Sequence, residues 1–380
     1  MTFMSEVLYN GFLTIKRYRG SLKEALIRSF KRLPESASLK ITGKKNEGPF
    51  FERMIKSLNP SFKGKVNLNK YENNVFSPEF LNDILSSELI DNVRVDPSKF
   101  LIKLKGNKML LGDESVTALQ LFKVDRYSGI TSLETKYTVR QVTFFMSLES
   151  ALTALVGLYS SYVTSIRYGG GNINYYFLFF SPEEVLSLTL PNGEKYLESY
   201  FLVKEGVIRK LREVISDFSS SELLLLETLI STELQRLMVR ENLDKVSFML
   251  FRIALEGRTY KIYEQLPITI YREPVFYKTV QRYFRDPQRF CERLSTFLGP
   301  KDVILSALSS LSRANRYSES DNVLRAIQEL YRFVVLGVAE GWMGFLKEIY
   351  ECYLKLINSD DPKEKGRALR YLSIVRSFRM

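Results

Sequence analysis

Hydrophobic positions recur with two different periods along the chain, and the dominant period changes near residue 205. Before that point, short apolar runs at residues 8–15, 99–105 and 175–180 predict strands, which are separated by helices and turns. After it, apolar residues recur every three or four positions, which is typical of amphipathic helices. We therefore predict an α+β protein. Its mixed N-terminal region, residues 1–205, has short antiparallel strands, and its C-terminal region, residues 206–380, is predominantly helical.

The longest apolar stretch of the first region predicts a helix that leads into a glycine-rich connection. Thr138 and Gln141 have the spacing of a capping box before a helix that runs to about Thr164. Ser181 and Pro182 then start another helix after the strand at 175–180. The connection from helix to strand contains Gly169, Gly170, Gly171, Asn172 and Asn174. Either chain flexibility or close approach of the backbone to a ligand explains these glycines.

The charge balance favours an anionic partner, and missing residue types exclude several kinds of site. The chain has 55 Lys and Arg against 43 Asp and Glu, a net charge of +12, which suits nucleic acid. Histidine is absent, so no histidine triad and no histidine metal site can form. Cys291 and Cys352 are too few for a cysteine zinc site, and we interpret them as buried small hydrophobic residues. No G-x-x-x-x-G-K-[ST] motif occurs, and we expect no cofactor.

No targeting or membrane segment is indicated by the sequence. The N-terminus lacks the basic, apolar and small-residue sequence of a secretory signal. The apolar helix expected at 140–164 contains Glu149 and many hydroxyl groups, and its charge-free run is too short for a convincing membrane span. We therefore expect a cytoplasmic protein without membrane contact.

Basic charge is concentrated in the first 110 residues, which contain 20 Lys and Arg against 11 Asp and Glu. Lys16, Arg17 and Arg19 surround Tyr18 near the N-terminus. Cations can neutralise phosphates while an aromatic ring stacks on a base, so this cluster is a candidate nucleic-acid site. A solvated helix face explains the same charges.

A second basic segment has the pattern of a β-hairpin. Gly106 and Asn107 form a two-residue turn signal between two short strands. Alternation along the first strand places Lys99, Lys103 and Lys105 on one face and apolar residues on the other. These lysines are candidate nucleic-acid ligands, although lysine also protects exposed sheet edges from aggregation.

A third basic segment, YREPVFYKTVQRYFRDPQRFCER, predicts two short helices divided at Asp286 and Pro287. Its five cations recur at helical spacing beside several aromatic residues, which makes them candidate contacts to a phosphate backbone. A solvated face above an aromatic core is the alternative. The five cations are Lys278, Arg282, Arg285, Arg289 and Arg293.

Catalytic signals are weak, and we expect a protein that is not an enzyme. The acidic residues are scattered, and the adjacent pair Asp360 and Asp361 before Pro362 is typical of a turn and a helix cap. Two alternatives to a nucleic-acid-binding protein stay open. One is a metal-dependent nuclease with a carboxylate site, and the other is a basic helical scaffold that meets acidic proteins or membranes.

The block YSGITSLETKYTVRQVTFFMSLESALTALVGLYSSYV, followed by YYFLFFSPEEV, resembles the large subunit of the archaeal type I-A CRISPR interference (Cascade) complex. The similar segment covers residues 127–185. The resemblance implies a non-enzymatic subunit beside the 5′ end of the CRISPR guide RNA. Its implied partners are target double-stranded DNA, the backbone and small subunits of the complex, and separate helicase and nuclease subunits.

The resemblance also implies a role for the glycine-rich connection. In related large subunits, a glycine-containing loop approaches the minor groove of the short motif that flanks the target. By analogy, Gly169–Gly171 would let the backbone lie close to DNA, and Asn172 or Asn174 would offer amide contacts. Base pairing would read the target, while protein would read only the flanking motif and the backbone.

Overall fold

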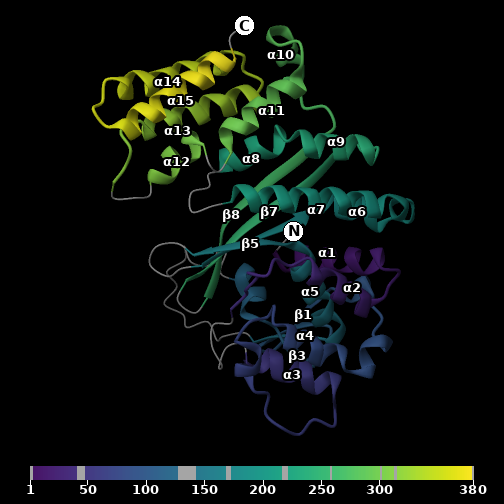
Figure 1. The fold of residues 1–380 in the computed structure, drawn as a ribbon. Helices are drawn as coiled ribbons and strands as arrows, with labels where there is room; N and C mark the ends of the chain where they lie inside the picture. Colours follow the sequence, from purple (N-terminus) through teal and green to yellow (C-terminus); the bar gives the residue numbers. More distant parts are fainter. Residues whose placement is uncertain are drawn as a thin grey trace. The chain divides into compact units, whose positions relative to one another are not determined.

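Helices and two four-stranded sheets form the architecture of the chain, and the α+β fold class is confirmed (Figure 1). The computed structural model describes residues 3–40, 48–126, 143–167, 173–215, 221–256, 259–299, 302–311 and 315–378. The chain divides into two compact units. The first contains residues 1–198 and 248–267, and the second contains residues 199–247 and 268–380.

The first unit begins with helices that the sequence did not all predict. Residues 8–15 lie in α1, so the strand expected there is wrong. The helix buries Phe3, Val7 and Ile15, and its packing against α5 overrides the local strand-like pattern. The helices and 3₁₀ turns before the first strand are α1 (Phe3–Arg17), α2 (Leu22–Lys31), α3 (Gly48–Leu58), η1 (Leu68–Tyr71), α4 (Pro78–Leu85), η2 (Glu88–Asn92) and η3 (Pro97–Lys99).

A small mixed sheet follows these helices, with the strand order β1-β2-β4-β3. The predicted turn at Gly106 and Asn107 is confirmed, because β1 and β2 pair antiparallel on either side of it and Gly106 has φ of +57°. β2 and β4 pair parallel, whereas the sequence predicted antiparallel strands in this region. The elements here are β1 (Ile102–Lys105), β2 (Lys108–Leu111), β3 (Val116–Thr117), η4 (Gln120–Arg126) and β4 (Thr143–Met146).

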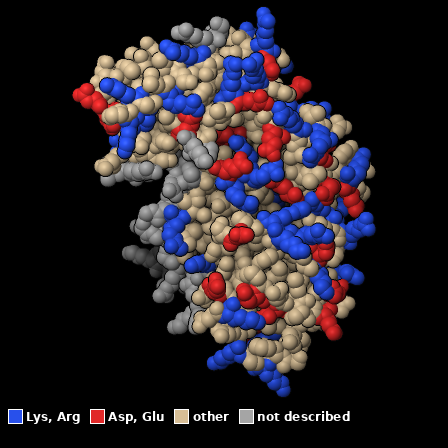
Figure 2. Space-filling view, in the orientation of Figure 1, with Lys and Arg blue, Asp and Glu red and all other residues tan. Residues whose placement is uncertain are grey.

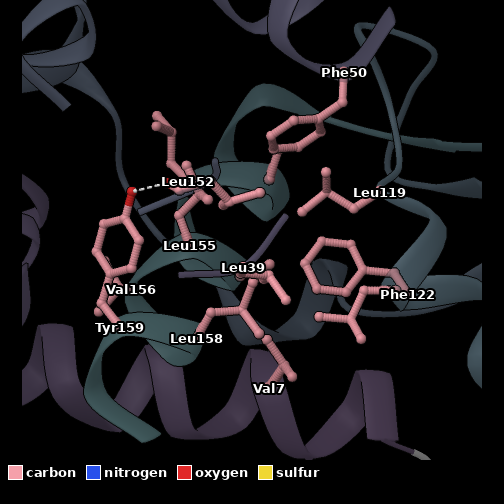
Figure 3. Close-up of a cluster of buried hydrophobic side chains, with 14 of the residues drawn as sticks. Val7, Leu39, Phe50, Leu119, Phe122, Leu152, Leu155, Val156, Leu158 and Tyr159 are labelled. Atoms are coloured by element: carbon pink, nitrogen blue, oxygen red, sulfur yellow. Dashed lines mark hydrogen bonds between the residues drawn. The ribbon is translucent and has the colours of Figure 1, made fainter. Parts of the chain in front are cut away.

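Helix α5 (Leu148–Ser161) is the centre of the first unit's core. Figure 3 shows Leu152, Leu155, Leu158 and Tyr159 of this helix beside Val7 of α1, all of them buried. The Tyr159 hydroxyl donates a hydrogen bond of 3.1 Å to a backbone carbonyl, which satisfies the polar end of a buried ring. α5 is buried along most of its length and therefore belongs to a protein core, as its sequence predicted.

The expected helix from 140 to 164 is wrong at both ends. Residues 143–146 form β4, Ser147 caps α5, and the chain turns into β5 (Tyr162–Arg167) directly after the helix. β5 pairs antiparallel with β6 (Ile173–Phe180). The glycine-rich connection therefore follows a strand and not a helix. Residues 162–167 include an aromatic residue and several β-branched residues, which favour a strand, although the apolar run of the helix continues into them.

The second sheet has the order β5-β6-β7-β8 and is built around the buried β6. β7 pairs antiparallel with β6 and joins β8 within a segment where the sequence predicted mainly helices. Residues 248–267 of these long strands belong to the first unit. The single domain boundary expected near residue 205 placed them in the C-terminal region. The strands are β7 (Lys245–Glu256) and β8 (Thr259–Tyr271).

Helices dominate the second unit, as predicted for the C-terminal region. Trp342 is buried against Phe284, Phe290 and Phe378, which gives this unit an aromatic core. Gly337, with φ of +72°, separates α13 from α14, as a glycine near a helix end does. The remaining elements of the chain are α6 (Pro182–Thr189), η5 (Pro191–Tyr196), α7 (Leu197–Val214), α8 (Ser221–Leu229), α9 (Thr232–Arg240), α10 (Phe276–Tyr283), α11 (Pro287–Leu298), α12 (Val303–Ser310), α13 (Ser320–Val334), α14 (Glu340–Ile357) and α15 (Pro362–Ser377).

Candidate nucleic-acid interface

The two short helices predicted around Asp286 and Pro287 are confirmed as α10 and α11. Phe276 and Val280 bury one face of α10, so the polar positions between them face solvent. Asp286 caps α11 by accepting hydrogen bonds from two backbone N–H groups, and Pro287 occupies the first helical position. The local sequence thus fixes both helices and the turn between them.

The five predicted cations of this segment are all exposed. Lys278 and Arg282 lie on α10, Arg285 lies in the turn, and Arg289 and Arg293 lie on α11. Arg293 donates a hydrogen bond of 2.9 Å to a backbone carbonyl at the end of α15. Within the described residues, the other four make no ion pair with an acidic side chain. Their charge is therefore available to a phosphate backbone.

A groove of about 800 Å³ lies beside Lys278, and its walls come from α9, the segment after β8, α10 and the start of α11. Of its cations, Arg236 pairs with Glu292 at 2.7 Å and Arg272 pairs with Asp244 at 3.0 Å, whereas Lys278 makes no ion pair within the described residues. Glu273 and Asp286 line the same groove. Val275, 73% exposed, contributes an apolar wall. The groove thus joins the cation Lys278 to the apolar side chain of Val275, a combination that suits sugars and bases between phosphates.

Arg236 also lines a second hollow, of about 400 Å³, between α7 and α9. Arg209 and Arg240 lie in the same hollow, but acidic partners hold all three arginines. Arg209 pairs with Glu233, Arg236 pairs with Glu292 at 2.7 Å, and Arg240 pairs with Glu241 at 2.9 Å. Figure 2 shows acidic side chains interspersed with basic ones on this face. The second hollow is thus less available to phosphates than the α10–α11 surface.

Tyr277 in the groove wall and Cys291 next to it both have raised pKa values. Tyr277 donates a hydrogen bond to the Gln235 side chain, and burial raises the pKa of its hydroxyl. Burial also raises the pKa of the Cys291 thiol to about 12, so no thiolate forms near pH 7. Cys291 and Cys352 are both buried, as the sequence predicted. The wall can position a ligand but supplies no activated nucleophile.

The N-terminal basic cluster is largely occupied by contacts within the first unit. Arg17 forms a bidentate ion pair with Glu198, at 2.7 and 2.5 Å, and its side chain is only 4% exposed. Lys16 donates a 3.4 Å hydrogen bond to a backbone carbonyl of α6. Arg19 is exposed and begins the turn after α1 with φ of +55°. Of the three predicted cations, Lys16 and Arg17 therefore contact other residues of the first unit, whereas Arg19 is an exposed turn residue.

The lysines of the predicted hairpin also differ from one another. Lys99 lies in η3, outside the strand, and its ammonium group is 3.7 Å from a carboxylate oxygen of Glu149. Lys103 and Lys105 lie on β1 and are exposed. The apolar residues Ile102 and Leu104 alternate with these lysines along β1, and they are exposed as well.

Most of the glycine-rich connection lies outside the described residues. Gly169, Gly170, Gly171 and Asn172 belong to this part of the chain. Asn174 lies on β6, opposite Ile166 of β5 and Ala254 of β7, and is half-buried. Asn174 is therefore a residue of a central strand.

Three arginines were not predicted from the sequence: Arg236 and Arg272, which line the groove, and Arg240, which lines the second hollow. Arg236 and Arg240 have the i, i+4 spacing that puts both on one face of α9, a signal that could have identified them. Arg272 follows β8 and donates a 3.1 Å hydrogen bond to a backbone carbonyl, a contact set by the fold. In the described ranges, no group of three or more Cys, Asp or Glu could hold a metal ion. The helices found there include none that is both long and apolar enough to cross a membrane.

The fold and this surface define a two-unit α+β protein with an exposed basic helical face. The chain is 45% identical over 382 residues to an uncharacterized protein of Archaeoglobus fulgidus, and the match covers 99% of this chain and 96% of the relative. It therefore belongs to the same protein family as that archaeal protein. No protein-family model and no solved structure matches the chain.

Proposed function

We propose that the protein is a non-enzymatic subunit that binds nucleic acid through the surface of α10 and α11. One observation carries the proposal. Four exposed cations, Lys278, Arg282, Arg285 and Arg289, lie on α10, the turn after it and α11, and they make no ion pairs within the described residues. Lys278 also lines the groove. Ion pairing is common elsewhere on this unit, so four adjacent cations without acidic partners favour an external anion.

Phosphates explain this surface better than an acidic protein does. Lys278 and Arg282 lie one helical turn apart on α10, and Arg285 and Arg289 follow in the turn and on α11, so the segment offers several cations to a repeating phosphate charge. The adjoining groove then offers the apolar side chain of Val275 and the exposed stem of Lys278 to sugars and bases. Such contacts position a nucleic acid without reading its sequence.

The biological setting that we propose follows the resemblance at residues 127–185. The protein would be the large subunit of an RNA-guided antiviral surveillance complex, with guide RNA, target double-stranded DNA and other subunits as partners. It would contribute to recognition of the flanking motif and to binding of target DNA. It would then present that DNA to a separate helicase and nuclease.

A salt titration of the complete chain tests the basic surface. Duplex DNA affinity is measured by fluorescence anisotropy at several salt concentrations for wild type and for a variant with Lys278, Arg282, Arg285 and Arg289 changed to Gln. Glutamine keeps a long polar side chain and removes the charge. We expect weaker binding of all sequences, because phosphate contacts do not depend on sequence.

A matched control removes the same number of charges from another part of the second unit. Four exposed cations of α14 and α15 serve this purpose: Lys347, Lys363, Lys365 and Arg376. If their change to Gln weakens DNA binding as much as the first variant does, the effect is one of net charge alone and the assignment to α10 and α11 is wrong.

A further inference from the structure

The β1 edge of the small sheet carries an exposed apolar surface that nucleic-acid binding does not explain. Leu101, Ile102 and Leu104 are 68%, 50% and 74% exposed. β1 lies at the end of the strand order and pairs only with β2 among the described residues. An exposed, apolar edge strand promotes aggregation unless another chain covers it.

The exposed side chains extend the core-facing side of the sheet. Ile102 lies opposite Leu111 and Leu104 lies opposite Met109, and paired residues share one face of a sheet. Leu111 is fully buried and Met109 packs against the core of the first unit. The core of the first unit thus covers this face of the sheet at β2, whereas the same face is exposed at β1.

The opposite face of β1 is cationic. Lys103 and Lys105 make no ion pair or side-chain hydrogen bond within the described residues. The nearby carboxylate of Glu114 pairs with Lys108 of β2 at 2.5 Å. The sequence suggested that these lysines protect the sheet edge from aggregation. They can do so on their own face only, because the apolar side chains of β1 project to the other face.

We propose that β1 is the docking site of another protein, which adds an extended segment to the sheet as a further strand. The segment would alternate aliphatic residues, which cover Ile102 and Leu104, with acidic residues, which face Lys103 and Lys105. Backbone hydrogen bonds to the free edge supply affinity, and the alternating side chains supply specificity. This proposal concerns the first unit and is independent of the DNA-binding surface on α10 and α11.

Two other occupants fit this edge less well. Pairing of β1 with β1 of a second copy would place Lys103 and Lys105 near the same lysines of the copy, and like charges in paired strands are unfavourable. Single-stranded nucleic acid prefers aromatic platforms, whereas the exposed apolar residues here are all aliphatic. The edge therefore favours an acidic and aliphatic protein segment.

The test uses the complete chain and a labelled synthetic peptide that alternates glutamate with valine. We expect binding in fluorescence anisotropy, together with slower hydrogen exchange of the backbone amides at 102–105. The variant Leu104→Lys adds positive charge but removes the apolar contact. It should bind the peptide about tenfold more weakly. The control Leu369→Lys changes a leucine of α15 that is 59% exposed, and it should bind as wild type does.

Charge reversal completes the test. The double variant Lys103→Glu and Lys105→Glu should lose the acidic peptide and gain a peptide that alternates lysine with valine. The proposal is wrong if Leu104→Lys binds the acidic peptide as well as wild type, or if wild type shows no binding. It is also wrong if analytical sedimentation shows that the chain self-associates through this edge. The proposal fails as well if the lysine variants change only the affinity for single-stranded DNA.

Discussion

Helices α1 and α5 cross with their backbones in contact, which makes Gly157→Ala a sharp test of the first unit's packing. A Cβ atom on Gly157 would lie 2.0 Å from the carbonyl oxygen of Val7. Gly11 faces α5 in the same way, since its Cβ would lie 2.1 Å from the carbonyl oxygen of Thr153. Ordinary contact begins at 3.4 Å, so α1 and α5 would have to separate by about 1.4 Å.

The expected loss combines two opposing effects. Overpacking of a core costs about 1–3 kcal/mol, and the upper value applies here because backbone, and no flexible side chain, occupies the space. Alanine is the better helix former by about 1 kcal/mol. We therefore expect Gly157→Ala to lower the free energy of unfolding by about 2 kcal/mol.

Urea denaturation measures this loss, with circular dichroism as the probe of the whole chain. Trp342 is the single tryptophan of the chain and lies in the second unit, so its fluorescence follows that unit separately. Gly366→Ala is the matched control, because Gly366 lies within α15 and a Cβ atom there meets nothing within 4 Å. It should be neutral or stabilise by up to about 1 kcal/mol. If Gly157→Ala is as stable as wild type, the close helix crossing is wrong.

Three further substitutions or treatments test contacts of the described residues. Arg17→Gln should lower the free energy of unfolding by about 1–2 kcal/mol at pH 7. Because the Arg17 hydrogen bond lowers the pKa of Glu198 from 4.5, the difference from wild type should disappear as the pH falls through that lowered pKa. A difference that persists at pH 2 contradicts the ion pair's role. Asn10→Ala should cost about 1–3 kcal/mol, because the buried side-chain Oδ1 of Asn10 accepts a hydrogen bond of 3.0 Å from the backbone N–H of Phe180. Equal stability would refute this. Iodoacetamide at pH 8 should leave Cys291 unmodified in the native protein and alkylate it in urea, as mass spectrometry can show, since burial raises the pKa of the thiol to about 12.

Short-range signals in the sequence predicted several elements correctly. The turn at Gly106, the cap at Ser181 and the proline start of α11 are each determined by residues within four positions, and all three are present. The apolar character of β6 also sufficed, because a buried central strand needs no alternation. Local chemistry thus predicted α10 and α11, the segment that carries the exposed cations of the proposed DNA-binding surface.

Long-range packing decided the elements that the sequence missed. Residues 8–15 have strand-like composition, yet the close crossing with α5 places them in a helix. Within the strands at 245–271, β7 pairs with β6, which lies far away in sequence, and β8 then pairs with β7. Likewise, the charge of Arg17 was visible in the sequence, but its pairing with Glu198 depends on the tertiary fold. Candidate cations could be identified locally, whereas their availability to a ligand could not.

The central claim is that Lys278, Arg282, Arg285 and Arg289 contact nucleic-acid phosphates, and the salt dependence of duplex DNA affinity tests it most directly. Each phosphate contact contributes about 0.9 to the slope of log affinity against log salt concentration. If all four contacts form, the variant with four glutamines should have a slope shallower by up to about 3.6, with affinity reduced equally for all sequences. A slope equal to that of wild type would contradict the claim and assign these cations to a solvated helix face.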